Sequence, residues 1–341
     1  MDFVKTSRTK IHLLYDNHGR QLRYLRLGVT ERCNLRCFYC MPEEGLNFSH
    51  KSQILSFEEM KRLTSILAKM GINKVRITGG EPFVRKNIMD LIEDLTHIEG
   101  IDSVNITTNG TNLIEHLPRL KAIGIDAINL SLDCLDKDRF FKITRRDEYD
   151  QVIASFHALM ESGISTKVNM VVMQEHNIDD IIPMSELTLT HNVSVRFIEE
   201  MPFNGGGKLF TPIKWNAKQI IEHVKTKYPA TVRLNDHESS TSHNYQLPDA
   251  KGSIGVIPAY TRTICTACDR IRLTPKGELK TCLYDSGVFS FRDFIRKGAT
   301  DLEIEDQFRK LFSNRAKDGF EAQQREKTNS NSFESMATIG G

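Results

Sequence analysis

The chain has 341 residues, of which 39% are hydrophobic and 26% charged, and its formal net charge is +2 at pH 7. This length and composition allow a large core and exclude a disordered or fibrous protein. The near-neutral charge gives no support for nucleic-acid or membrane partners, no apolar run approaches the roughly 20 residues of a membrane span, and the N-terminus lacks the apolar region of a signal peptide.

Up to about residue 200, short β-branched segments alternate with longer amphipathic segments. The short segments predict six strands, at residues 24–29, 74–78, 103–108, 127–132, 166–172 and 193–198. The longer segments predict helices at residues 57–70, 86–97, 111–123, 149–162 and 179–190, the first of them opened by the capping box Ser56-Phe-Glu-Glu and closed by Gly71. Repeated strand–helix units form a parallel sheet, and six can curve into a partial barrel with its chemistry at the carboxyl ends of the strands.

After about Trp215 the alternation ends. One helix, a polar stretch at 236–244 and short strands around Cys265 to Cys282 follow. We therefore expect an α/β fold: a partial (β/α)6 TIM-like barrel with a C-terminal α+β extension that covers the barrel mouth. The predicted divisions are 1–230 for the barrel, 231–322 for the extension and 323–341 for a tail.

Cys33, Cys37 and Cys40 have the spacing Cys-x3-Cys-x2-Cys and directly follow the first predicted strand. Three thiolates can hold three irons of a [4Fe-4S] cluster and leave the fourth iron open to a small molecule. Zinc sites usually have four ligands, and disulfides are rare inside cells. The spacing therefore predicts an iron-sulfur cluster.

A second group of three, Cys265, Cys268 and Cys282, lies in the C-terminal part. A second [4Fe-4S] cluster is the sharper interpretation. A zinc site stays open as an alternative, but it would need a fourth ligand, and the nearest histidine candidate, His243, lies upstream without ligand-like spacing. The seventh cysteine, Cys134, is expected to be a buried bystander. Thiolate clusters need a reducing compartment, so we expect the cytoplasm.

Five arginines lie in or at the ends of predicted strands: Arg26, Arg76, Arg196, Arg270 and Arg272. Guanidinium groups bind phosphates with two-pronged geometry, but a strand arginine in a barrel either lines the lumen or points outward, and both remain open. Arg270 and Arg272 are two residues apart and so share one face. Since the chain has no Gly-x4-Gly-Lys-Ser/Thr motif, a nucleotide would not be bound by a P-loop.

Several motifs together resemble one family. They are the first cysteine group with Tyr39 before its last cysteine, Gly79-Gly80-Glu81-Pro82, Arg26 in Leu-Arg-Leu-Gly-Val-Thr, Thr107-Thr-Asn-Gly, Ser131-Leu-Asp, Arg196-Phe-Ile-Glu, Cys265-x2-Cys-Asp-Arg-Ile-Arg and the terminal Gly340-Gly341. From about residue 10 to the last residue, the chain resembles the GTP 3′,8-cyclase family (molybdenum cofactor biosynthesis protein A family) of the radical S-adenosylmethionine (SAM) superfamily.

The resemblance implies a radical SAM lyase with two [4Fe-4S] clusters and SAM as cofactors. Its reaction would convert GTP to (8S)-3′,8-cyclo-7,8-dihydroguanosine 5′-triphosphate by H3′ abstraction and C3′–C8 bond formation, the first step of molybdenum cofactor (molybdopterin) biosynthesis. Two alternatives remain: another radical SAM enzyme with an auxiliary cluster acting on a peptide, and a zinc-stabilised binding protein.

The resemblance also implies roles for individual residues. SAM would be bound by Tyr39, Gly80, Glu81, Ser131 and Met201; GTP by Arg26, Arg76, Thr107, Lys167, Arg196, Arg270 and Arg272; and Arg270, Arg272, Gly340 and Gly341 would be catalytic. A strand-to-helix turn is the alternative for Gly79-Gly80-Glu81-Pro82, and a packing or solvent position is the alternative for Ser131 and Met201. A disordered polar tail is the alternative for the final glycines. Two departures from the family pattern are Arg145-Arg146 and the roomy loop that begins at Met201.

The partners implied by the resemblance are a second copy of the chain in a homodimer and an electron donor such as flavodoxin or ferredoxin. A cyclic pyranopterin monophosphate synthase would act next on the product.

Overall fold

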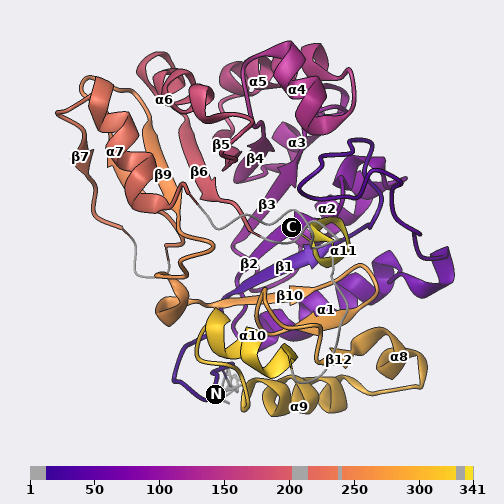
Figure 1. Ribbon diagram of the computed structural model, residues 1–341. Coiled ribbons are helices and arrows are strands. Elements are labelled where there is room, and N and C mark those ends of the chain that lie inside the picture. Colours follow the sequence, from indigo (N-terminus) through magenta and orange to yellow (C-terminus); the bar gives the residue numbers. More distant parts are fainter. Residues whose placement is uncertain (1–12, 202–213, 237–239, 328–334, 341) are drawn as a thin grey trace, which may run out of the picture.

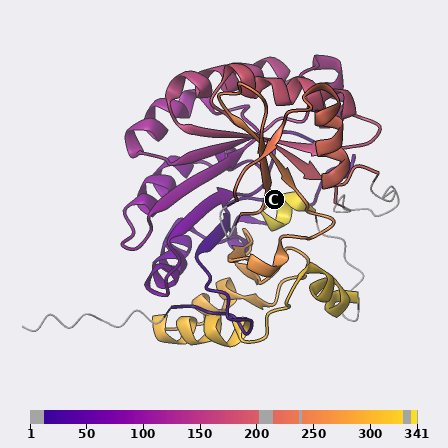
Figure 2. The same cartoon turned by 90° about the vertical axis from the view of Figure 1, so that its left-hand side faces the viewer.

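The computed structural model describes residues 13–201, 214–236, 240–327 and 335–340. In these residues, twelve strands form one sheet in the order β12-β11-β10-β1-β2-β3-β4-β5-β6-β9-β8-β7 (Figures 1 and 2). The six central strands are parallel, as predicted: β1 (Tyr24–Gly28), β2 (Lys74–Thr78), β3 (Ser103–Thr108), β4 (Ala127–Ser131), β5 (Ser165–Val172) and β6 (Ser194–Glu199). The sheet curves without closing, which confirms the predicted partial barrel.

Helices cover the convex side of the sheet (Figure 2). They are α1 (Phe57–Lys69), α2 (Ile88–Thr96), α3 (Leu117–Ile123), α4 (Lys137–Thr144), α5 (Tyr149–Ser162) and α6 (Ile181–Thr190). The predicted capping box is present, because Ser56 Oγ accepts a hydrogen bond from Glu59 N and the Glu59 carboxylate accepts one from Ser56 N. The helix predicted at 111–123 is shorter, since α3 begins only after a 3-10 turn and has Pro118 in its first turn. Helix α4 was not predicted.

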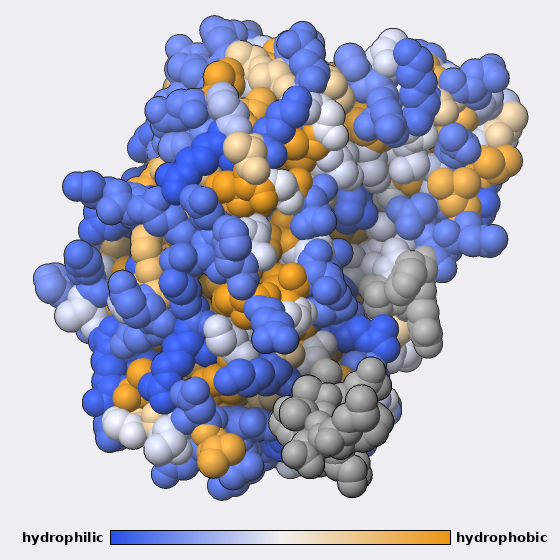
Figure 3. Space-filling view, turned by 180° about the vertical axis from the view of Figure 1, so that it is seen from behind, coloured by the Kyte–Doolittle hydropathy of each residue, from blue (hydrophilic) through white to orange (hydrophobic). Residues whose placement is uncertain are grey.

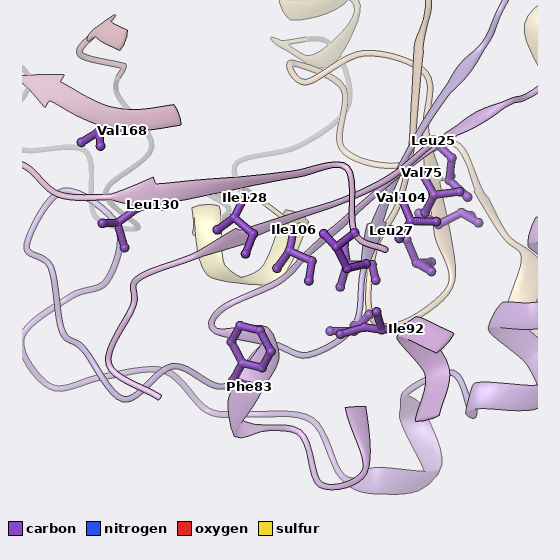
Figure 4. Close-up of a cluster of buried hydrophobic side chains, with 14 of the residues drawn as sticks. Leu25, Leu27, Val75, Phe83, Ile92, Val104, Ile106, Ile128, Leu130 and Val168 are labelled. Atoms are coloured by element: carbon purple, nitrogen blue, oxygen red, sulfur yellow. The ribbon is translucent and has the colours of Figure 1, made fainter. Parts of the chain in front are cut away.

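Side chains alternate between the two faces of each central strand. Leu25 and Leu27 of β1 are fully buried toward the helices, whereas Arg26 between them lines the inner face. Figure 4 shows Leu27, Ile106 and Ile128 pointing toward the side on which Ile92 of α2 lies. Each such buried aliphatic side chain contributes about 1.5–3 kcal/mol to folding, so the apolar face fixes the register and turns every second residue into the lumen.

The C-terminal part extends both edges of the sheet. We had predicted only that it would cover the barrel mouth. Strand β9 (Ser253–Ile257) pairs in parallel with β6 and continues through β8 (His243–Gln246) and β7 (Val232–Arg233). At the other edge, β10 (Arg270–Leu273) pairs in parallel with β1 and continues through β11 (Glu278–Lys280) and β12 (Phe289–Ser290). Residues 258–269 therefore run from one end of the curved sheet to the other. The proposed division at residue 230 stays a prediction.

The remaining helices are α7 (Ala217–Lys227), α8 (Phe291–Arg296), α9 (Asp301–Phe312), α10 (Gly319–Lys327) and α11 (Met336–Ile339). Helix α11 lies inside the curve of the sheet, opposite the outer helices (Figure 2), and Gly340 at its end approaches Gly28 of β1. Polar residues cover most of the face seen in Figure 3, with apolar residues gathered near its middle. Within the described part of the chain, every helix is too short or too polar to cross a membrane.

Candidate active site

A cavity of about 900 Å³ lies inside the curved sheet. Its wall combines the inner faces of the strands with the loops at their carboxyl ends. The predicted site residues in this wall are Arg26, Cys33, Cys37, Tyr39, Cys40, Arg76, Gly80, Thr107, Ser131, Lys167, Arg196, Met201, Cys265, Cys268, Arg270, Arg272 and Cys282. The fold thus brings together residues that are up to 256 positions apart in the chain, from Arg26 to Cys282.

The first cysteine group occupies the loop after β1. This loop is anchored to the end of α4, because Arg36 N donates to Thr144 O at 2.9 Å and Phe38 N donates to Ile143 O at 3.1 Å. Burial raises the pKa of the Cys33 thiol to about 12, with a further contribution from the Glu81 carboxylate, and burial likewise raises that of Cys40 to about 11. A buried thiolate in such surroundings needs a cation beside it, which a metal centre provides.

The second group has a different electrostatic environment. Cys265 and Cys268 bracket a 3-10 turn in which Cys268 N donates to Cys265 O at 3.2 Å, while Cys282 follows β11. Burial acts to raise the pKa of Cys268, but the positive charges of Arg270 and Arg315 outweigh it and lower that pKa. Burial raises the pKa of Cys282 to about 11.

Each group offers three sulfur atoms to the cavity, and this donor set fits a [4Fe-4S] cluster with one open iron. Cys134 is fully buried outside the cavity wall, as expected for a bystander. His243, the candidate fourth zinc ligand, lies in β8, next to the edge strand β7, and contacts Arg233 and Asp236. In the described ranges, no three His, Cys, Asp or Glu side chains are grouped closely enough to share a single metal ion.

Three arginines form a row across neighbouring strands of the inner face. In the sheet register, Arg26 of β1 lies opposite Arg272 of β10 on one side and Arg76 of β2 on the other. All three side chains line the cavity. Like charges directly opposite one another destabilise a sheet, so this row is an arrangement that an anionic ligand would stabilise.

Other inner-face cations add to this positive surface. Burial, reinforced by Arg76 and other cations, lowers the pKa of Arg196 to about 10, and burial together with Arg196 lowers that of Lys167 to about 8. Arg76 Nη1 and Arg196 Nε are buried without a hydrogen-bond partner among the described residues. Unpaired buried donors are costly, and they fit a polar ligand held in the cavity.

Sequence reasoning missed three polar residues of the same face. Tyr24 lies beside Arg270 and Lys74 in the register, and its hydroxyl accepts a hydrogen bond from Arg76 Nε. Asn129 and Asn169 line the cavity with buried side-chain oxygens that lack a partner in the described part of the chain. The sequence shows these residues only as polar positions in the alternation of a strand. Such alternation is found on any solvent-exposed face of a sheet, so it does not identify a site.

The residues predicted for SAM differ in their placement. Tyr39, Gly80, Ser131 and Met201 line the cavity, whereas Glu81 does not. The Glu81 carboxylate is fully buried and accepts hydrogen bonds from Phe83 N, Thr108 Oγ1 and Asn109 N. In this position it fixes the β2 and β3 loops, and its predicted contact with SAM stays a prediction.

Gly79 and Gly80 allow a close approach of two backbones. Gly80 N donates to Thr30 O at 2.7 Å, and an added Cβ at Gly80 would lie 2.2 Å from Arg32 O. The turn alternative therefore has a concrete basis, and it places the loop after β2 against the loop that carries the first cysteine group.

The C-terminal tail enters the barrel. Ser335 Oγ donates to Cys40 O at 2.5 Å, and Arg272 Nη1 donates to Gly340 O at 3.1 Å. Gly340 has a φ of +75°, and a Cβ there would lie 2.8 Å from Thr78 Oγ1. The disordered-tail alternative is therefore wrong for residues 335–340. Gly341 lies outside the described residues.

Of the two departures from the family pattern, Arg145 has a structural consequence. It caps α4 with a left-handed φ of +56°, a conformation that suits glycine and asparagine better than arginine. Its guanidinium donates to Met41 O at 3.4 Å, next to the first cysteine group.

Two family models match the chain in succession. The Radical SAM superfamily model matches residues 27–188, and the Molybdenum Cofactor Synthesis C model matches residues 193–321. The boundary between them lies where β6 begins, so together they span both the barrel and the second cysteine group.

Curated relatives resemble most of the chain. "GTP 3',8-cyclase, mitochondrial" of Arabidopsis thaliana is 40% identical over 85% of this chain and 74% of its own length, and "GTP 3',8-cyclase" of Peptoclostridium acidaminophilum is 37% identical over 84% and 88%. "Molybdenum cofactor biosynthesis protein 1" of Homo sapiens is 39% identical over 85% of this chain but 46% of its own length. The chain thus spans about half the length of several relatives that it matches.

Among solved structures, the crystal structure of Streptococcus suis SuiB is similar, with a TM-score of 0.62 and 16% identity over 86% of this chain and 68% of that one. At this identity the likeness shows the fold alone.

Proposed function

The chain belongs to the GTP 3′,8-cyclase family of the radical SAM superfamily, and from this premise we propose that it converts GTP to (8S)-3′,8-cyclo-7,8-dihydroguanosine 5′-triphosphate. The reaction would be the first step of molybdenum cofactor biosynthesis. The observation that carries the proposal is the arginine row Arg272–Arg26–Arg76, which lies in the same cavity wall as both cysteine groups.

Two [4Fe-4S] clusters and SAM fit the donor groups of this cavity. Cys33, Cys37 and Cys40 would hold the cluster that binds SAM, and Cys265, Cys268 and Cys282 would hold the second. When bound, these cofactors supply the one-electron chemistry that removes the hydrogen from C3′ of the ribose.

The chain's own residues bind and orient the nucleotide. Arg26, Arg76 and Arg272 would bind the triphosphate, with guanidinium geometry matched to phosphate oxygens. Arg196 and Lys167, on β6 and β5, would add further charge from the same cavity wall. Holding C3′ and C8 of one nucleotide in place favours ring closure over competing reactions.

The tail would complete the site. Arg272 contacts Gly340 O, so one guanidinium links the predicted phosphate site to the tail. Deleting Gly340 and Gly341 is expected to abolish the cyclised product while both clusters remain bound; unchanged turnover would remove this role. Arg270→Ala is expected to leave SAM cleavage normal and to prevent cyclisation.

A peptide substrate is the second candidate, since SuiB has been solved "bound to precursor peptide SuiA". That protein is 17% identical to this chain, and peptide binding gives no reason for a row of three arginines inside the cavity. The family relatives and the arginine row favour GTP.

The partners and location are proposals of the same kind. A homodimer, a flavodoxin or ferredoxin as electron donor and a downstream cyclic pyranopterin monophosphate synthase follow from the family. A cytoplasmic site follows from the cysteines, although the Arabidopsis relative is named mitochondrial.

The test begins with anaerobic purification and reconstitution with iron and sulfide. 5′-Deoxyadenosine and a cyclised nucleotide are then measured with SAM, dithionite and each nucleoside triphosphate in turn. GTP-dependent formation of both supports the proposal. If deoxyadenosine forms without any dependence on the nucleotide, GTP is not the substrate. If a protein with both clusters bound forms neither product, the proposal that the chain is a radical SAM enzyme is wrong.

A further inference from the structure

Three charged residues outside the predicted site form a cluster beside the second cysteine group. We call Asp16, Arg20 and Arg315 the Asp16 triad. Asp16 Oδ2 accepts hydrogen bonds from Arg20 Nε at 2.6 Å and from Arg315 Nη1 at 3.1 Å. The side chains of Asp16 and Arg315 are 0% and 3% exposed, so this pairing is shielded from solvent.

Arg315 reaches two of the cysteine-bearing segments. Its guanidinium donates to Cys268 O at 2.9 Å and, through Nε, to Thr281 O at 2.9 Å, next to Cys282. It also donates through Nη2 to Arg270 O at 2.9 Å. A planar group with five N–H donors can hold several carbonyls in fixed relative positions.

Arg20 holds the third segment. Arg20 Nη1 donates to Cys265 O at 3.1 Å. Asp16 itself is fixed by a turn in which its Oδ1 accepts from His18 N at 2.9 Å and Arg20 N at 3.0 Å. The carbonyls of Cys265, Cys268 and Thr281 are thus tied to one buried carboxylate through two guanidiniums.

Arg315 also contacts sulfur directly, because Nη2 lies 3.4 Å from Cys268 Sγ. Hydrogen bonds to cluster sulfurs and net charge near a cluster set its reduction potential. A positive donor stabilises the more negative, reduced form of a cluster, and the buried position of Arg315 limits screening by water.

We propose that the Asp16 triad positions the three cysteines of the second group, and that Arg315 raises the reduction potential of the cluster they hold. This inference rests on the proposed function insofar as Cys265, Cys268 and Cys282 must bind an iron-sulfur cluster. It assigns a positioning role, not a catalytic one, to residues outside the arginine row.

The test isolates the second cluster in the full chain. Cys33→Ser, Cys37→Ser and Cys40→Ser are combined so that iron can bind only at the second group. After anaerobic reconstitution, iron and sulfide per chain are measured, and the midpoint potential is determined by redox titration followed by electron paramagnetic resonance.

Variants of the triad predict shifts of opposite sign. Arg315→Gln removes a positive charge and is expected to make the midpoint potential more negative, with Arg315→Lys lying between it and the parent. Asp16→Asn removes a negative charge and is expected to make the potential more positive. Arg309→Gln is the matched control, because it removes the same charge from an arginine that pairs with Glu305 and donates to Leu13 O.

The outcomes separate this inference from its premise. A parent chain that binds no iron at the second group refutes the proposed function, and the inference falls with it. A loaded cluster whose potential is the same in Arg315→Gln and Arg309→Gln overturns the inference alone, as do shifts of the same sign in Arg315→Gln and Asp16→Asn. Iron loss in Arg315→Gln but not in Arg309→Gln supports the positioning role, and Arg315→Lys then tests the potential.

Discussion

The two cysteine groups have the same number of ligands but opposite surroundings. Near the first group, Cys33 Sγ accepts a weak hydrogen bond from the neutral amide of Asn109 at 3.7 Å, and the buried carboxyls of Glu81 and Asp133 lie nearby. Near the second group, Cys268 Sγ accepts from the guanidinium of Arg315. The first environment opposes added negative charge, whereas in the second the arginines around Cys268 favour it, although burial still raises the pKa of Cys265 and Cys282.

This difference assigns separate tasks to the two ends of one cavity. A cluster in neutral or acidic surroundings is harder to reduce and therefore a stronger electron donor, whereas a cluster beside buried cations is easier to reduce. The cationic end also carries Arg270 and Arg272, which suit an anionic substrate. We expect reductive cleavage of SAM at the first group and substrate binding at the second.

Replacing one cysteine of each group should have the largest effect and tests this separation. Cys37→Ser should abolish formation of both 5′-deoxyadenosine and cyclised nucleotide, because the cluster that binds SAM is lost. Cys268→Ser should abolish the nucleotide product but preserve deoxyadenosine formation. Both products are quantified by chromatography and mass spectrometry, with Cys134→Ala as the matched control outside the cavity. Loss of deoxyadenosine in Cys268→Ser at full occupancy of the first cluster would show that the two ends do not act separately.

Much of the fold that carries the two cysteine groups could be predicted from local sequence. The six central strands were found within one residue of their observed bounds, since alternating apolar residues must face the helices. The same alternation did not show whether the strand arginines point into the lumen or outward, because either face of a strand can accept a long side chain. Only the register of Arg272, Arg26 and Arg76 shows that they point inward as a row.

The Asp16 triad shows what local sequence cannot provide. Asp16 and Arg315 are 299 residues apart, and neither belongs to a motif with a known spacing. Their pairing depends on β10 joining the edge of β1, which brings the C-terminal part beside the N-terminal turn. Tyr24 was missed for a different reason, since a tyrosine in a strand is ordinary for β-structure.

The arginine row gives the next largest effect and sharpens the assignment of the substrate to the cationic end. Arg26→Ala should weaken GTP binding by roughly 10- to 150-fold, since one charge-assisted hydrogen bond contributes about 1.5–3 kcal/mol. SAM affinity should change little. Binding is measured by equilibrium titration of the reconstituted protein, and Arg233→Ala, in the edge strand β7 outside the cavity wall, is the control. Equal losses for GTP and SAM would contradict the separation.

The tail contacts both ends, through Ser335 at Cys40 and through Gly340 at Arg272, so a change there should affect turnover with both clusters intact. Gly340→Ala should lower product formation severalfold, because alanine at φ +75° costs about 1–2 kcal/mol and its Cβ would lie 2.8 Å from Thr78 Oγ1. Gly163→Ala is the matched control: its φ is +78° with nothing within 4 Å of the added Cβ. Equal turnover in the two variants, measured beside iron content and thermal stability, would remove the functional role of Gly340.

The smallest expected effect is on the pH dependence of GTP binding, and it tests whether the cationic end acts as one charged surface. Burial, with the charge of Arg196 and other cations, lowers the pKa of Lys167 to about 8, and a bound triphosphate would favour the protonated amine and raise that pKa. Affinity should therefore fall as pH rises through 8. For Tyr24, burial acts to raise the pKa, but Arg76 and Arg26 outweigh it and lower the pKa to about 7, so a phenolate forms above pH 7 and also weakens anion binding.

Two substitutions separate these contributions. Lys167→Arg should remove the step near pH 8, and Tyr24→Phe should remove the step near pH 7, each by up to about tenfold per unit of pH for one proton. Each variant is compared with the parent at every pH, so that ionisation of GTP itself cancels. SAM binding at the other end of the cavity should show neither step, because Lys167 and Tyr24 lie among the arginines of the inner face and not in the surroundings of Cys33 and Cys37. If both steps appeared equally for SAM, the charges of the two ends would be coupled across the cavity, and the opposite surroundings of the cysteine groups could not by themselves set separate tasks.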